Sequence, residues 1–372
     1  MKKSLLALAV LTAVSGAAFA QSSVTLYGKV DLGMVYDAGN PVGAGKSVRL
    51  SSGVTGGSRI GFKGVEDLGG GNKFSFQLET GYCADSAAGQ ATDVKDPSGT
   101  TKIGTTSAPN FCTGSNNFMG RQAHGDLTGA FGALSAGRQY SLGFNNLATI
   151  DPFGAGFAAQ ANNVSNTGTY LVDPSGIRLN NSVTYSTPNV AGFTGSVEAA
   201  FGEVVGNWKS GRETGAGVNY ASGPVYAGIT YYAVNTAAGS GAAKRVTTFG
   251  GSYDFGVVKV HALGQKVSGN FGAIDIFNIM GGVTVPVGAG SLMASYVKHN
   301  DRTSKDQDAN QVGVGYQYPL SKRTALYTSF ARIQNHNITG ATAATNSAIL
   351  VGNATDVGTG QKAFNAGVVH NF

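Results

Sequence analysis

The chain has 372 residues, of which 57 are glycine and 12% are charged, and its net charge is +6. The charged share is about half, and the glycine share about twice, the average of globular proteins. Beyond the N-terminal segment there is no run of about 18 apolar residues, so transmembrane helices are excluded. Few charges and many glycines suit a chain whose apolar residues face lipid at alternate positions.

The first twenty residues have the pattern of a secretory signal peptide. Lys2 and Lys3 precede an apolar run from Leu5 to Val14, and Ala18-Phe19-Ala20 provides a small-residue cleavage pattern. The alternative, a membrane anchor, needs about twice that apolar length. The predicted domains are therefore a signal peptide at 1–20 and a mature chain at 21–372.

The mature chain alternates apolar and polar residues with a period of two. Residues 23–36 carry apolar side chains at most even positions, while Lys29 and Asp31 stand at odd ones. Residues 72–82 and 311–318 alternate in the same way. Successive side chains of a strand point to opposite faces, so each stretch predicts a strand with one apolar face. A soluble sandwich would also alternate, and the spacing of the connections distinguishes the two.

The connections between these stretches are alternately short and long. Short turns begin at Asp67, Leu127, Pro188, Ser222, Phe255, Val287 and Pro319. Longer polar segments cover about 37–45, 84–116, 142–176, 203–212, 235–243, 267–273, 299–309 and 335–361. Fifteen connections join sixteen strands, and strict alternation places all long loops at one end. This predicts an all-β fold, a 16-stranded antiparallel transmembrane β-barrel.

The last residues continue this pattern to the end of the chain. Phe364, Val368 and Phe372 fall on one face of a final strand. A barrel in lipid cannot leave an open edge, so this strand must pair with the first one. Phe372 is expected in the aromatic girdle at the rim with the short turns.

Several segments together resemble the general porin family of Gram-negative bacteria, in particular porins of the Burkholderia–Neisseria type. They are QSSVTLYGKVDLGM from Gln21, SRIGFKGVEDLGGGNKFSFQLETGY from Ser58, RLNNSVTYSTPNVAGF from Arg178, YQYPLSKRTALYTSFA from Tyr316 and the terminal GVVHNF. The resemblance implies a trimeric barrel in the outer membrane, with a water-filled pore narrowed by an inward-folded third loop. Acidic groups of that loop would face basic residues on the opposite wall.

The resemblance also implies partners. These are two further copies of the chain in a homotrimer, outer-membrane lipid and lipopolysaccharide, small hydrophilic solutes and ions, and the barrel assembly machinery, which would read Phe372. No nucleic-acid partner is expected. The implied function is passive diffusion of ions and small solutes across the outer membrane.

The third long segment contains DPFGAGF from Asp151, which resembles the family's loop motif of proline, glutamate, phenylalanine and two glycines. Pro152 stands where the family has the acid, and Asp151 is the nearest carboxylate. Asp151 either replaces the missing acid or only initiates a turn, as Asp-Pro often does.

Candidate basic residues of the constriction follow from strand parity and from position. Arg59 and Lys63 alternate with outward Ile60 and Phe62, so they should face inward. The same argument turns Arg178 inward, with Leu179, Val183 and Tyr185 facing lipid. Arg121 and Arg138 match the family's basic wall by their position in the sequence. The alternative for each is a rim charge or a structural ion pair. Several cations against about one acid predict mild anion selectivity.

The two cysteines, Cys83 and Cys112, flank or lie within one long polar segment. In a secreted chain they predict a disulfide, with two free thiols as the alternative.

Other functions have little support in the sequence. NPVGAGKSV from Asn40 lacks the first glycine of a P-loop and precedes a strand-like stretch. The five histidines show no metal-ligand spacing, so neither a cofactor, a metal nor an enzyme activity is expected. A non-conducting barrel acting as an adhesin or anchor is the alternative function.

Overall fold

The structure is a computed structural model, which describes residues 23–38, 46–85, 119–164, 176–235, 244–269, 274–337 and 362–372. The predicted signal peptide and Cys112 lie outside these residues, so the predicted cleavage is not tested by the structure.

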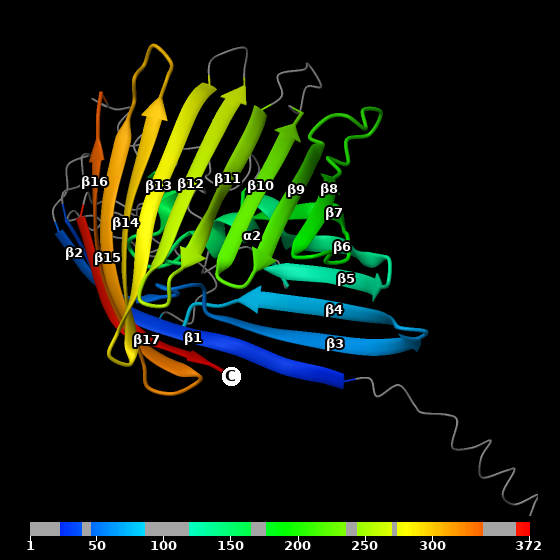
Figure 1. Ribbon diagram of the computed structural model, residues 1–372, viewed down its shortest axis with the longest axis horizontal. Coiled ribbons are helices and arrows are strands. Elements are labelled where there is room, and N and C mark those ends of the chain that lie inside the picture. The colour runs from blue at the N-terminus through cyan, green and yellow to red at the C-terminus, as the bar shows by residue number, and fades with distance from the viewer. Residues whose placement is uncertain are drawn as a thin grey trace, which may run out of the picture.

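Strands make up most of the described chain (Figure 1). They are β1 (Ser23–Ala38), β2 (Lys46–Ser52), β3 (Arg59–Gly69), β4 (Asn72–Gly81), β5 (Gln122–Gly129), β6 (Gly132–Tyr140), β7 (Arg178–Ser186), β8 (Phe193–Ala200), β9 (Glu213–Ser222), β10 (Val225–Val234), β11 (Lys244–Asp254), β12 (Lys259–Gly269), β13 (Ile274–Val287), β14 (Gly290–Asp301), β15 (Ala309–Pro319), β16 (Thr324–Asn335) and β17 (Lys362–Asn371). Helix α2 (Leu142–Ile150) and the 3₁₀ helix η1 (Ala161–Val164) interrupt them. In the described part of the chain, no helix is long and apolar enough to cross a membrane.

The strands form one closed antiparallel barrel. From β3 onward each strand pairs with the next one in sequence, and β17 returns to β1, from Lys29 opposite Asn371 to Ala38 opposite Lys362. Both β2 and β3 pair with β1, so they are two halves of one wall position separated by residues 53–58. The seventeen segments described thus form the sixteen positions of the predicted barrel, which is confirmed.

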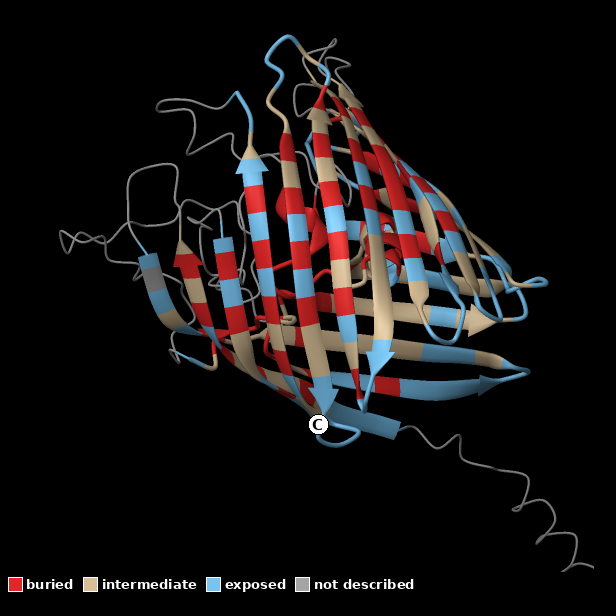
Figure 2. Cartoon of the chain, turned by 60° about the vertical axis from the view of Figure 1, so that its left-hand side comes forward, coloured by how far each residue is buried: buried red, intermediate tan, exposed pale blue. Residues whose placement is uncertain are grey.

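The alternation of the sequence becomes an alternation of burial along the strands (Figure 2). In β16, for example, Tyr327 and Ser329 are buried toward the interior while Leu326 and Phe330 are exposed on the outside. A soluble monomer rarely exposes so many large apolar side chains, and a lipid-facing barrel must.

The predicted alternation of connections is confirmed except between β12 and β13, where the connection 270–273 is no longer than the 255–258 turn between β11 and β12. Short turns join β3 to β4, β5 to β6 and every second pair thereafter, and the longer segments lie at the opposite ends of the strands. The turn between β3 and β4 uses Gly70 and Gly71, whose φ angles of 61° and 81° suit the type I′ turn that matches strand twist.

The C-terminal residue is part of the closure. The Phe372 N–H donates to the Gly28 carbonyl at 3.1 Å, and the Gly28 N–H donates to the Phe372 carbonyl at 3.0 Å. The Phe372 ring lies over Gly28, where a β-carbon would approach it to 2.3 Å. Phe364, Val368 and Phe372 are all exposed on the outer face.

Deleting Phe372 is expected to lower the amount of barrel inserted in the outer membrane, because it removes this backbone pair and the ring together. Channels that do insert should keep their single-channel conductance, since the Phe372 side chain lies on the outer face. Quantifying folded protein in outer-membrane fractions, with Phe372→Tyr as the aromatic control, checks this. Normal levels of the deletion variant would show that Phe372 is not an assembly signal.

Candidate functional site

Loop 3, the name used here for the described residues of the third long connection (141–164 and 176–177), packs against the inside of the barrel. Ser141 caps the N-terminus of its helix α2, and the Ser141 hydroxyl accepts from the Phe144 N–H at 3.1 Å. Along the helix, Tyr226 of β10 donates to Asn146 at 3.0 Å. At its end, the Ile150 carbonyl lies 2.7 Å from His261 Nδ1 of β12. The helix is therefore anchored to the inner wall.

Beyond α2, loop 3 continues across the interior to the strands on the far side. The Ala158 N–H donates to Ser329 Oγ of β16 at 3.1 Å, and Asn163 Nδ2 donates to Gln311 Oε1 of β15 at 2.8 Å. The Phe157 N–H donates to the carbonyl of Val54 at 2.8 Å, in the break between β2 and β3. The inward-folded third loop is thus confirmed, and the break in the wall is one of its docking points.

Inward glycines provide space for the loop. A β-carbon on Gly313 would lie 2.3 Å from the Ala159 side chain, and one on Gly282 would lie 2.8 Å from Pro152. These wall positions carry no side chain because loop 3 approaches the wall to van der Waals contact.

Asp151 organises loop 3 and does not face open space. Its carboxylate is 3% exposed. It accepts from the N–H groups of Phe153 at 3.0 Å, Ala155 at 3.2 Å and Ala161 at 2.9 Å. Burial raises the pKa of Asp151 to about 6, and the three N–H donors act against that rise. Of its two expected roles, the geometry supports the turn-forming one.

Two arginine side chains, Arg59 of β3 and Arg121 directly before β5, meet at one buried acid, Glu79 of β4. Arg121 Nε donates to Glu79 Oε1 at 2.7 Å, and Arg59 Nε of β3 lies 3.2 Å from Glu79 Oε2. Arg121 and Glu79 are 1% and 3% exposed. Removing Glu79 would leave the buried Arg121 guanidinium without its counterion, which is costly in a buried place.

Tyr140 extends this group to a third arginine. Its hydroxyl oxygen accepts from Arg121 Nη2 and from Arg178 Nη2, both at 2.9 Å. The Arg178 guanidinium also lies 4.5 Å from the centre of the Tyr140 ring. Arg59, Glu79, Arg121, Tyr140 and Arg178 are here called the arginine cluster. Three guanidiniums and one carboxylate give it a formal charge of +2.

Two of the predicted basic residues lie outside this cluster. Lys63 is exposed, and its Nζ lies 5.4 Å from the centre of the Tyr27 ring. Arg138 Nε donates to the Gly120 carbonyl at 2.7 Å, and its Nη1 donates to Asn180 Oδ1.

The strand-parity prediction for β7 is wrong at the N-terminal end of the strand. Leu179, expected to face lipid, is 3% exposed and packs with Ala200 and inward Tyr232. The pairing of β6 with β7 shifts register here, and Asn181 has a φ of 51°. This β-bulge reverses the alternation. Arg178 is therefore placed by Tyr140 rather than by the strand pattern.

Sequence reasoning missed two members of the cluster. Glu79 falls on the inward parity of β4, but nothing local showed that it would meet Arg121, 42 positions away. Tyr140 is the last residue of β6, directly before loop 3. The only feature of the sequence that pointed to Tyr140 was an aromatic hydroxyl directly before loop 3.

Cys83 is buried and disulfide-bonded. Its predicted partner, Cys112, lies outside the described residues, so the pairing stays a prediction.

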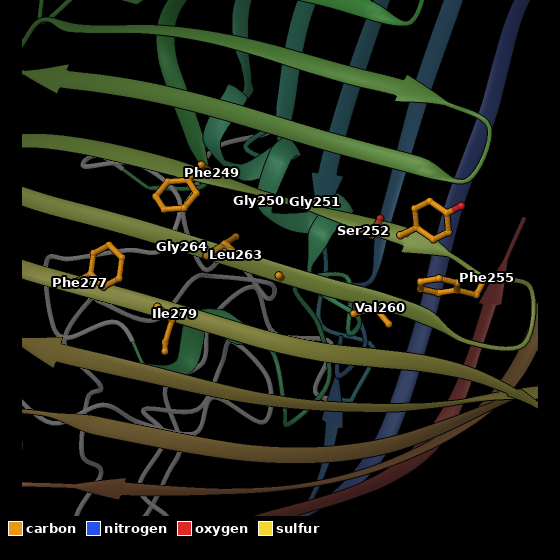
Figure 3. A pocket seen from close by; sticks show the side chains of 12 residues that line it. Phe249, Gly250, Gly251, Ser252, Phe255, Val260, Leu263, Gly264, Phe277 and Ile279 are labelled. Atoms are coloured by element: carbon orange, nitrogen blue, oxygen red, sulfur yellow. The ribbon is translucent and has the colours of Figure 1, made fainter.

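An apolar groove of about 570 Å³ lies on the outer wall, across β11 to β13 (Figure 3). Phe249, Phe277 and Ile279 stand on one side of these strands, around a floor that includes Gly250, Gly251 and Gly264. The groove has no charged lining residue and faces outward, so it is no path for hydrophilic solutes.

A closed antiparallel barrel with a loop packed inside it and charged groups on its inner wall defines an outer-membrane channel. The family model described as Gram-negative porin matches residues 7–338, and the chain belongs to this family. It is 38% identical over 349 residues to outer membrane porin protein 32 of Delftia acidovorans, with 90% of each chain covered. It is 28% identical over 361 residues to the major outer membrane protein P.IB of Neisseria meningitidis serogroup B, covering 90% of this chain and 94% of the relative.

Among solved structures, the chain is similar to an anion-selective porin from Comamonas acidovorans. The TM-score is 0.71 and the identity 30%, with 95% of this chain and 100% of that chain covered. The protein is therefore an outer-membrane porin of a Gram-negative bacterium and not an enzyme. The family favours the channel over the non-conducting barrel.

Proposed function

We propose that this porin is a general diffusion channel with a mild preference for anions, and that the arginine cluster sets the preference. The observation that carries the proposal is the +2 charge of the cluster, on the wall where loop 3 enters the barrel. Asp151, the nearest acid of the loop, is enclosed by backbone N–H groups and offers no opposing charge to the pore. The similarity to a porin described as anion-selective supports the same reading.

The cluster acts through its electrostatic field more than through direct contact. Arg121 is almost completely buried, and a buried charge is screened less by salt than an exposed one. A pore with low-dielectric walls focuses this field on its aqueous path. Chloride is therefore concentrated in the constriction, and potassium is depleted.

Single-channel recording in a KCl gradient tests the proposal. The reversal potential should have the sign of chloride preference and decrease in size as the salt concentration rises, because screening weakens the field. Liposome swelling with neutral sugars should show entry below a size limit. A reversal potential on the potassium side would contradict the anion preference while leaving the pore itself intact.

We propose further that three copies assemble in a membrane of lipid and lipopolysaccharide, and that the assembly machinery reads the Phe372 end. Family membership supports the trimer, and the exposed Phe372 supports the second point. Mass measurement of the detergent-solubilised protein tests the trimer, for which three times the chain mass is expected.

A further inference from the structure

Tyr140 connects three parts of the pore that are distant in sequence. Its hydroxyl oxygen accepts from both Arg121 and Arg178 at 2.9 Å. Its ring stacks on Phe144 of α2, with centroids 4.7 Å apart and an interplanar angle of 26°. As the last residue of β6, it also directly precedes Ser141, where loop 3 begins.

The two guanidiniums need a shared acceptor because they carry the same charge. Glu79 is hydrogen-bonded to Arg121 and paired with Arg59, but the structure shows no such contact between Glu79 and Arg178. Within the described residues, Arg121 Nη1 and Arg178 Nε are buried without a hydrogen-bond partner. The phenolic oxygen is therefore the one described atom that binds both cations. Hydrogen bonds to charged groups are also stronger than neutral ones.

We infer that Tyr140 is the positioning residue of the selectivity site, on the proposed function that the arginine cluster sets anion preference. Its hydroxyl holds Arg121 and Arg178 at one height of the pore, where their fields add. Its ring fixes that pair against the first turn of loop 3. Tyr140 carries no charge to the site and acts only by keeping two charges together.

Tyr140→Phe tests this inference because it retains the ring and its stacking and removes only the shared acceptor. Without that acceptor, repulsion separates the two guanidiniums and lowers the peak of the positive potential. The reversal potential in a KCl gradient should shift toward zero, by less than in Arg178→Ser. The matched control is Tyr185→Phe in β7, which loses a hydroxyl bonded to the Phe131 carbonyl on the outer face. It should leave the reversal potential unchanged.

Combining the variants separates positioning from a general structural effect. In the Arg178→Ser background there is no second cation to hold, so adding Tyr140→Phe should produce a clearly smaller further shift than it does in the wild type. Equal shifts in both backgrounds would overturn the inference, as would an unchanged reversal potential in Tyr140→Phe. If the wild type itself shows no anion preference, the proposed function fails instead, and the two failures are distinguishable.

Discussion

Replacing Arg59 and Arg121 together by serine should abolish the chloride preference. A unit charge about 5 Å from an ion in water contributes about 0.8 kcal/mol, roughly a four-fold change in local ion concentration. The two changes remove two positive charges from a cluster whose formal charge is +2. The reversal potential in a KCl gradient should then fall close to zero. The open pore should still conduct ions.

Lys63→Ser is the matched control for this experiment. Lys63 lies on the same strand as Arg59, but its ammonium contacts the Tyr27 ring rather than the cluster. It should shift the reversal potential less than either arginine. A double variant that kept the wild-type reversal potential would show that the selectivity arises elsewhere in the pore.

Glu79→Gln should act in the opposite direction on selectivity and should also lower stability. The amide removes the single negative charge of the cluster, so chloride preference should increase. It also leaves the buried Arg121 without its counterion, which costs about 3–5 kcal/mol for comparable buried pairs. Reversal potentials and the temperature of barrel unfolding in detergent measure the two effects.

Asp151→Asn provides the matched control, since it makes the same change from acid to amide. Its carboxylate binds the N–H groups of loop 3 and not the arginines. We expect a less stable loop, and a reversal potential much nearer the wild type than that of Glu79→Gln. If Asp151→Asn raised chloride preference as strongly, Asp151 would be a pore acid after all.

The barrel could be predicted from the sequence because the patterns that indicate it lie within single strands and their adjoining connections. Alternation with a period of two follows from strand geometry, and it identified the outward faces of β1, β4 and β15 without any knowledge of their neighbours. The order of short and long connections then required an even number of strands. The apolar C-terminal stretch had to close onto the first strand, because a membrane allows no open edge.

The selectivity site could be predicted only in part, because its contacts join distant segments. Arg59, Arg121 and Arg178 were identified as candidates, and they do meet. Arg59 and Arg121 pair with Glu79 on the wall rather than with Asp151 on the loop, and Arg178 joins them through Tyr140. The three backbone donors around Asp151 converge only when loop 3 is folded.

The tertiary structure also decided where strand periodicity stops. One bulge at Asn181 turned Leu179 inward and left Arg178 to be placed by Tyr140. A single added residue reverses every side chain on one side of it, and no local pattern marks that residue in advance. The sequence by itself thus determined the closed barrel and the basic character of its interior. Only the folded chain determined which charges are neutralised, since that depends on pairs formed across strands and loop.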